Sequence, residues 1–76
     1  MNPTAVEETI LSVLATVTKS DISGLTMDTP LAELGLKSIQ LVSLCALLDE
    51  KLGDGPNFRA LMGMEKIGDI RDYVLR

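Results

Sequence analysis

Apolar residues recur at helical spacing in three stretches of the chain, and no stretch alternates as a strand would. The first stretch covers residues 4–18, where one face holds Val6, Ile10, Val13, Leu14 and Val17. Asn2 can cap this helix and Pro3 suits its first position, while Thr4 paired with Glu7 offers an alternative start. Glu7 and Glu8 are then expected to be a solvated helix start near the positive end of the dipole.

Residues 19–37 show no sustained helical periodicity, yet they contain five apolar residues: Ile22, Leu25, Leu31, Leu34 and Leu36. A long loop with this many apolar residues is expected to be pinned to a core. Asp28-Thr29-Pro30 resembles a cap followed by a proline at the first helical position. Residues 30–34 are therefore predicted to form one helical turn, which Gly35 stops.

Residues 38–52 form the second predicted helix, which ends at Gly53 and carries two apolar stripes. The larger stripe holds Leu41, Leu44, Cys45, Leu48 and Leu52, with Leu47 beside it. The smaller stripe holds Ile39, Val42 and Ala46. A surface helix normally has one apolar stripe, so the smaller one is either buried by another element or offered to a partner.

The rest of the chain predicts a short and a longer helix. Asn57 can cap a short turn over residues 58–62, with Phe58, Leu61 and Met62 on one side. The last helix covers roughly residues 65–75, with Ile67, Ile70 and Val74 at helical spacing, and Gly68 weakens it slightly. The predicted fold is all-α: one domain over residues 1–76, a small four-helix bundle of three main helices and one short helix, with a long first loop.

The amino-acid composition excludes several classes of function. The chain has 76 residues, no histidine, one cysteine and a net charge of −4. A zinc site or a serine–histidine relay is therefore not expected, and neither is nucleic-acid binding, because the basic residues are scattered. We predict no metal site, signal peptide or membrane span. The single cysteine fits a reducing compartment, so we expect a cytoplasmic protein that is not an enzyme.

The run DTPLAELGLKSIQLV, residues 28–42, resembles the signature of acyl carrier proteins and their peptidyl carrier relatives. A Thr-Pro-Leu element, a leucine-glycine turn and a serine at the head of the second helix are matched by Thr29, Pro30, Leu31, Leu34, Gly35, Ser38 and Ile39. The tail MEKIGDIRDYV resembles the family's last helix, and its matching positions are Ile67, Asp69, Ile70 and Val74. Element lengths also match over nearly the whole chain.

The resemblance implies that Ser38 receives 4′-phosphopantetheine from coenzyme A and holds a substrate as a thioester at the end of that arm. From the local pattern alone, Ser38 is a helix N-cap, and both roles suit a serine at this position. Helix amides tolerate a phosphodiester there, and tethering raises the effective concentration of the cargo. The implied partners are a phosphopantetheinyl transferase and the acyl- or aminoacyl-loading and synthase enzymes.

Two departures from the family change the expected pathway. The family usually has aspartate before the serine, where this chain has Lys37, and fatty-acid carriers usually have an acidic second helix. We therefore expect an acyl carrier of a specialised pathway, polyketide or a related secondary metabolite, with fatty-acid synthesis as an alternative. A peptidyl or aminoacyl carrier and an unmodified helical interaction module also remain open, and Lys37 is the feature that favours the module.

The smaller stripe of the second helix is interpreted as a partner-docking surface. Lys37, Ile39, Gln40, Val42 and Ala46 would contact partners, and Asp49 and Glu50 would steer basic ones. Cys45 is expected to be a small buried hydrophobe. We expect a monomer because this stripe is small, and the chain's start at Met1 favours a free-standing carrier over an excised module.

Overall fold

Four α-helices and one short 3-10 turn make up the fold of this chain, for which the computed structural model describes residues 2–19 and 23–76. In chain order these are α1 (Pro3–Thr18), the 3-10 turn η1 (Leu31–Leu34), α2 (Ser38–Leu52), α3 (Phe58–Met62) and α4 (Ile67–Leu75). The described ranges contain no strand, only an isolated bridge between Pro30 and Lys66. The predicted all-α bundle is confirmed.

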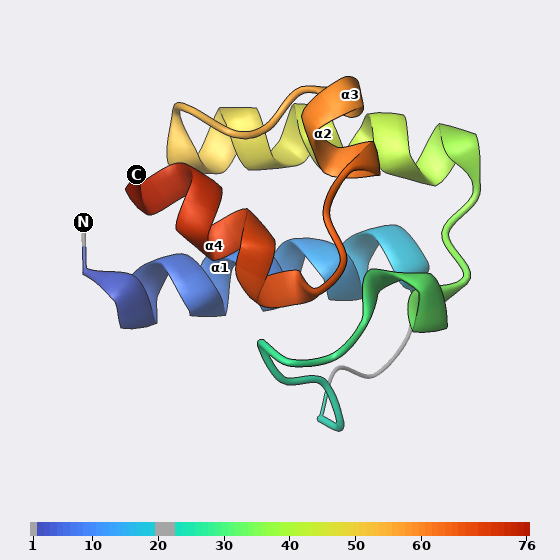
Figure 1. The fold of residues 1–76 in the computed structure, drawn as a ribbon, viewed down its shortest axis with the longest axis horizontal. Coiled ribbons are helices and arrows are strands. Elements are labelled where there is room, and N and C mark those ends of the chain that lie inside the picture. The colour runs from blue at the N-terminus through green and yellow to red at the C-terminus, as the bar shows by residue number, and fades with distance from the viewer. Residues whose placement is uncertain (1, 20–22) are drawn as a thin grey trace.

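The two long helices lie side by side in opposite directions, and α4 crosses them diagonally (Figure 1). Contacts join α1 to both α2 and α4, and α2 to α3. Residues 23–37, the described part of the long connection, pass along the outside of the bundle before the chain enters α2 (Figure 1). Throughout the described ranges, no helix is long and apolar enough to cross a membrane.

Helix α1 begins and ends where its local sequence allows. The Asn2 side chain accepts a hydrogen bond from the Ala5 N–H at 2.7 Å, and Pro3 occupies the first turn. The alternative start at Thr4 is therefore not used. Glu7 is not a solvated helix start as predicted, because its carboxylate lies 2.8 Å from the guanidinium of Arg71 on α4.

The core is made of side chains from all four α-helices. The buried apolar residues are Val6, Ile10, Val13, Leu14, Leu44, Leu48, Leu61, Ile67 and Ile70. Each such side chain contributes about 1.5–3 kcal/mol relative to an exposed one. No polar or charged residue is buried among the described residues, so apolar packing holds α1, α2 and α4 together.

The long connection is tied to the start of α4 by backbone hydrogen bonds. Leu31 N–H donates to the Glu65 carbonyl at 2.9 Å, and Ile67 N–H donates to the Thr29 carbonyl at 3.0 Å. Its apolar residues Leu25, Leu31, Leu34 and Leu36 pack partly buried against the core. The prediction of a pinned loop is confirmed for these residues, while Ile22 lies outside the described residues.

The helical turn before α2 begins one residue later than predicted. Pro30 has extended backbone angles, φ −64° and ψ 135°, so it precedes the turn instead of opening it. This extended conformation lets Pro30 form the isolated bridge with Lys66. Gly35 ends the turn at φ 62°, as predicted, and this left-handed conformation favours glycine.

Helix α4 also begins later than predicted, at Ile67. The Asp69 carboxylate accepts hydrogen bonds from the N–H groups of Glu65 at 2.9 Å and Lys66 at 3.2 Å, which holds the chain outside the helix there. Gly68 is buried, and its N–H donates to the Met27 carbonyl at 2.7 Å. A Cβ on Gly68 would lie 2.9 Å from that carbonyl oxygen, so the close approach requires glycine.

Candidate functional site

Ser38 is the first residue of α2, and its side chain is exposed. The N-cap is Lys37, with extended backbone angles of φ −85° and ψ 163°. The expectation that Ser38 caps the helix was therefore wrong by one residue. This shift matters because the Ser38 hydroxyl is not used to hold the helix start.

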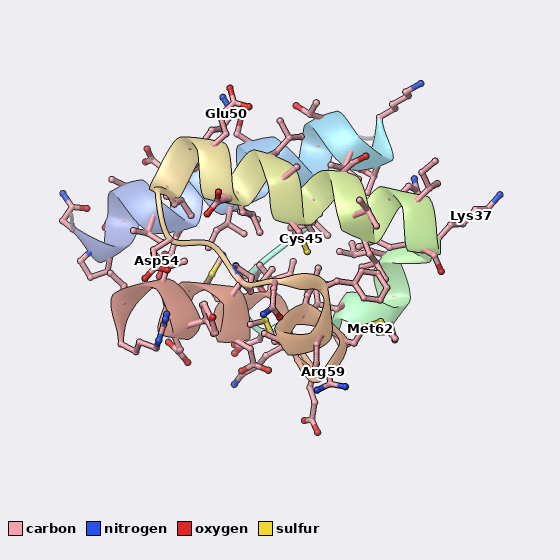
Figure 2. The ribbon with its side chains drawn as sticks, turned by 90° about the horizontal axis from the view of Figure 1, so that it is seen from above. Lys37, Cys45, Glu50, Asp54, Arg59 and Met62 are labelled. Carbon is pink, nitrogen blue, oxygen red and sulfur yellow. The ribbon has the colours of Figure 1, made fainter. Side chains whose placement is uncertain are left out.

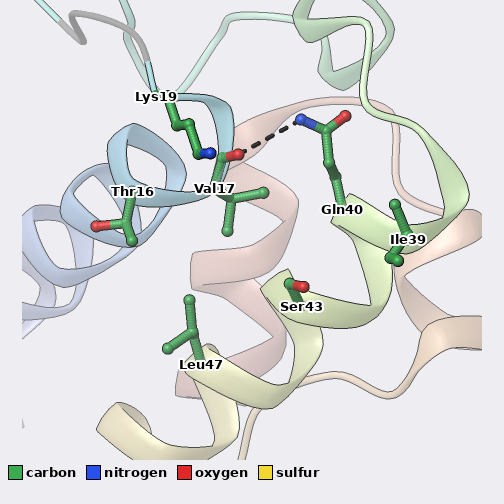
Figure 3. Close-up of a pocket in the computed structure, with 7 residues that line it drawn as sticks. All are labelled: Thr16, Val17, Lys19, Ile39, Gln40, Ser43 and Leu47. Carbon is green, nitrogen blue, oxygen red and sulfur yellow. Dashed lines mark hydrogen bonds between the residues drawn. The ribbon is translucent and has the colours of Figure 1, made fainter.

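The Gln40 side chain supplies one half of a capping box at the start of α2. Its Oε1 accepts a hydrogen bond from the Lys37 N–H at 2.8 Å. The reciprocal bond of a full capping box is missing, because a lysine ammonium donates but cannot accept. The Gln40 Nε2 also donates to the Val17 carbonyl on α1 at 3.4 Å (Figure 3). Gln40 thus fixes the start of α2 against the end of α1.

The geometry around Ser38 fits a phosphodiester. Helix geometry leaves the N–H groups of Ser38, Ile39 and Gln40 without an intrahelical acceptor, and such groups attract an anion. Within the part of the chain that the structure describes, the Ser38 hydroxyl makes no hydrogen bond and Lys37 makes no ion pair. Free helix amides and an exposed hydroxyl therefore lie together at the start of α2, directly after Lys37 in the chain.

Open grooves flank α2, and two of them lie near its N-terminal half. One, of about 280 Å³, lies between the end of α1 and α2 and has a partly polar lining: Thr16, Val17, Lys19, Ile39, Gln40, Ser43 and Leu47 (Figure 3). The other, of about 310 Å³, is lined by apolar residues alone: Leu31, Ala32, Leu36, Leu41, Leu61, Met62 and Met64. A group tethered at the head of α2 therefore has a mixed surface on one side of the helix and an apolar surface on the other.

The smaller apolar stripe of α2 is uncovered in the structure. The side chains of Ile39 and Val42 are 75% and 56% exposed, and Ala46 is exposed as well. The prediction that this stripe lies outside the core is confirmed, while its contact with a partner stays a prediction. Asp49 and Glu50 are exposed in the C-terminal half of α2, and Figure 2 shows Glu50 far from Lys37.

Helix α3 adds exposed apolar side chains that the sequence did not reveal. Phe58 and Met62 were expected to share one side with Leu61, but they are 39% and 60% exposed, and only Leu61 is buried. A five-residue helix is too short for periodicity to show which side faces the core.

Cys45 is half-buried near the middle of α2 (Figure 2). Burial raises the pKa of its thiol above the ordinary 9.0, with a smaller opposing effect from a backbone hydrogen bond. A thiol with a raised pKa is a poor nucleophile at neutral pH. Cys45 was predicted to be a buried small hydrophobe, but it is only half-buried at the edge of the core.

Comparison with known families identifies the class of protein. The family model for the phosphopantetheine attachment site matches residues 8–74. The chain therefore belongs to this family, whose members are carriers that bind covalently attached 4′-phosphopantetheine and work with phosphopantetheinyl transferases and synthase enzymes. No curated protein and no solved structure matched the chain.

Proposed function

We propose that this chain is an acyl carrier protein whose 4′-phosphopantetheine arm is attached to Ser38. The observation that carries the proposal is the position of Ser38: its exposed hydroxyl, with no hydrogen bond to any described residue, opens a helix whose first N–H groups are free for an anion. In the attachment step, Ser38 Oγ forms a bond to the phosphorus that coenzyme A presents. The bond to adenosine 3′,5′-bisphosphate breaks, and a base of the transferase takes the hydroxyl proton.

The arm, once attached, supplies a thiol on which a cargo is held as a thioester. The residues of this chain hold the attachment point: Gln40 fixes the helix start, and Gly35 turns the preceding chain toward it. The free N–H groups of the first turn of α2 stabilise the phosphodiester's negative charge. The carrier presents the cargo at high effective concentration to each enzyme in turn.

An acyl cargo suits the structure better than an aminoacyl cargo. The apolar groove between η1, α2 and α3 has no charged or polar side chain in its lining. An alkyl chain can lie in such a groove, and methionines such as Met62 and Met64 adapt to irregular shapes. A charged α-amino group would lose its hydration there without a partner. This supports an acyl carrier over a peptidyl or aminoacyl carrier.

We place the carrier in a specialised pathway, polyketide or a related secondary metabolite, ahead of fatty-acid synthesis. Helix α2 carries no charged residue between Lys37 and Asp49, unlike the acidic second helix typical of fatty-acid carriers. Partner enzymes would contact Lys37, Ile39, Gln40, Val42 and Ala46, with Asp49 and Glu50 at the far end. The small stripe supports a monomer, and the single cysteine supports the cytoplasm.

A second candidate function is an interaction module of the same fold that carries no arm. The specific observation that favours it is Lys37, since transferases commonly contact an acidic residue at this position through basic groups. Such a module would bind its partner through Ile39 and Val42 and would be indifferent to the loss of the Ser38 hydroxyl.

The two functions are separated by intact-mass measurement. The purified protein is incubated with coenzyme A, magnesium and a broad-specificity transferase, and so are its Ser38→Ala and Ser43→Ala variants. Ser43 is a matched control, because it is also exposed on α2. A carrier gains one phosphopantetheine in the wild type and in Ser43→Ala, and none in Ser38→Ala.

If the wild type gains no mass, the same assay on the Lys37→Asp variant decides between the carrier and the interaction module. Modification of that variant alone means that the site is sound and its transferase is specialised. No modification of a folded Lys37→Asp variant overturns the carrier function in favour of the interaction module.

A further inference from the structure

The partly polar groove between the end of α1 and α2, which we call the α1–α2 groove, opens beside the proposed attachment point. Its lining on α2 begins at Ile39 and Gln40, which directly follow Ser38, and continues to Leu47 (Figure 3). At 1.5 Å per helical residue, Leu47 lies about 13.5 Å from Ser38 along the axis of α2. An arm attached at Ser38 can fold back over this distance, so a cargo at its tip can reach the groove.

The α1–α2 groove offers hydrogen-bonding groups and a cation. Thr16 and Ser43 contribute hydroxyls from its two walls, and Lys19 contributes an ammonium. The Thr16 hydroxyl donates to the Ser12 carbonyl at 3.1 Å, and its oxygen can still accept a hydrogen bond. The Lys19 side chain extends from the end of α1 toward Val17 (Figure 3) and makes no ion pair with a described residue.

Lys19 has a backbone conformation that glycine adopts more easily. It follows the last residue of α1 with φ 55° and ψ 35°, in the left-handed region. Among the described residues it is the only non-glycine residue with a positive φ, whereas the corresponding cap of α2 is Gly53. This region favours glycine because glycine has no Cβ. A lysine here keeps an ammonium beside the groove at the expense of a strained backbone.

No carboxylate of a described residue lines the α1–α2 groove. The carboxylates of its two helices lie outside the lining, in the N-terminal half of α1 and near the C-terminal end of α2: Glu7, Glu8, Asp49 and Glu50. Asp21 lies outside the described residues. Within the described lining, the ammonium of Lys19 therefore has no counter-ion, and an anionic group that enters the groove gains a favourable charge interaction.

We propose that the α1–α2 groove binds a short acyl cargo that ends in a carboxylate, which pairs with Lys19 while Thr16 and Ser43 form hydrogen bonds to its oxygens. This inference rests on the proposed function and narrows its cargo. The groove volume of about 280 Å³ equals that of about nine water molecules at about 30 Å³ each. The bound part of the cargo is therefore limited to about nine non-hydrogen atoms.

The apolar groove between η1, α2 and α3 does not suit this cargo. A carboxylate there would lose its hydration without gaining a partner, because no polar or charged side chain lines that groove. An alkyl chain has the opposite preference. The two grooves therefore sort acyl cargoes by their terminal group.

The phosphodiester of the arm is a second anion near the start of α2. It is bonded to Ser38 Oγ, where the first-turn N–H groups of α2 already bind an anion. Lys19 lies on the other wall of the groove, at the end of α1. A comparison of the arm without cargo and the arm with cargo distinguishes the two anions.

The test loads two cargoes with the same number of carbons, glutaryl, which ends in a carboxylate, and pentanoyl, which ends in a methyl group. A broad-specificity transferase transfers each acyl-phosphopantetheine from its coenzyme A thioester to the isotope-labelled protein, or to Lys37→Asp if the wild type is not accepted. In amide NMR spectra, glutaryl should shift Thr16, Val17 and Ser43 relative to the protein with an unloaded arm. Pentanoyl should leave these amides unchanged and shift Leu61 and Met64 of the apolar groove instead.

Variants of Lys19 separate cargo binding from folding. Lys19→Gln should abolish the glutaryl shifts, whereas the matched control Lys51→Gln, an exposed lysine at the end of α2, should keep them. The pKa of the glutaryl carboxyl should be lower on the wild type than on Lys19→Gln by about 0.1–0.7 pH units, as expected for an exposed ion pair. Lys19→Gly suits the left-handed cap, so it should be no less stable in urea and should still lose the glutaryl shifts.

Three results overturn the inference while Ser38 is loaded and the proposed function stands. Glutaryl and pentanoyl could give the same shifts, which would show that the groove does not select a carboxylate. The unloaded arm could already give the full shifts, which would assign Lys19 to the phosphodiester. The carboxyl pKa could be equal on the wild type and on Lys19→Gln. If neither the folded wild type nor Lys37→Asp accepts an acyl-phosphopantetheine, the proposed function fails together with the inference.

Discussion

The Gln40 side chain accepts a hydrogen bond from the backbone N–H of Lys37 at 2.8 Å, across the point where the chain enters α2. Ser38 lies between these two residues, so the bond fixes the backbone on both sides of the proposed attachment point. Ser38 itself does not cap the helix, because the N-cap is Lys37. The Ser38 hydroxyl is therefore free to carry a phosphodiester.

Replacing Gln40 should loosen the start of α2. Gln40→Ala removes the bond to the Lys37 N–H and the 3.4 Å bond to the Val17 carbonyl, so we expect a loss of about 1 kcal/mol in the free energy of unfolding. Gln40→Glu keeps an acceptor for Lys37 and loses only the donor to Val17, so it should lose less. Urea denaturation of the three proteins measures this, and equal stabilities would show that Gln40 does not hold the junction.

Gly68 should be difficult to replace, because a backbone carbonyl of the long connection lies close to it. A Cβ there would lie 2.9 Å from the Met27 carbonyl oxygen and 3.4 Å from the Met27 Cβ, so Gly68→Ala must displace the connection or α4. We expect a loss of about 1–3 kcal/mol, the usual range for overpacking. Gly24→Ala is the control, because no atom lies within 4 Å of its added Cβ. Equal midpoints of thermal unfolding for the two variants would contradict the close approach of the Met27 carbonyl to Gly68.

The start of α4 should make stability depend on acid pH. Hydrogen bonds from the Glu65 and Lys66 N–H groups lower the pKa of Asp69 below its ordinary 3.8. Stability from this carboxylate is therefore present above pH 3.8 and is lost as the pH falls through the lower folded-state pKa. Asp69→Ala should be less stable than the wild type at neutral pH, and the difference should shrink in acid. Denaturation midpoints across this range measure the effect, and a constant difference would exclude this role for Asp69.

Cys45 should not interfere with chemistry at the thiol of the arm. Its side chain is half-buried and burial raises the pKa of its thiol, so little thiolate is present at neutral pH. We expect iodoacetamide to alkylate the unmodified protein more slowly than it alkylates N-acetylcysteine, and to label the phosphopantetheine-bearing protein rapidly at one additional thiol. Equal rates for Cys45 and N-acetylcysteine would contradict the assigned environment.

The sequence predicts those parts of this fold that depend on local periodicity. Helices α1 and α2 were placed to within a residue, because their apolar residues recur over four turns or so and their starts and ends carry recognisable signals. The Asn57 cap of α3 was likewise found from the local sequence, and the structure confirms its bond to the Ala60 N–H at 2.8 Å.

Features that depend on contacts between distant segments were not predictable in this way. The pairing of Thr29 with Ile67 and of Met27 with Gly68 fixes the connection and the start of α4, and no local pattern encodes it. The ion pair of Glu7 with Arg71 joins residues far apart in the chain. At the site itself, the sequence indicated the importance of Ser38 through a family resemblance. The capping by Gln40 was missed because glutamine three residues after a lysine is not a familiar capping pair.

The central claim, that Ser38 carries the arm, is tested most directly by locating the added mass within the chain. After treatment with coenzyme A and a transferase that accepts the protein, trypsin cleaves after Lys37 and after Lys51, and the released peptide 38–51 contains Ser38 and Ser43. Fragmentation of this peptide should place one phosphopantetheine on its N-terminal residue, Ser38. A phosphopantetheine on Ser43 or on another peptide would contradict the account.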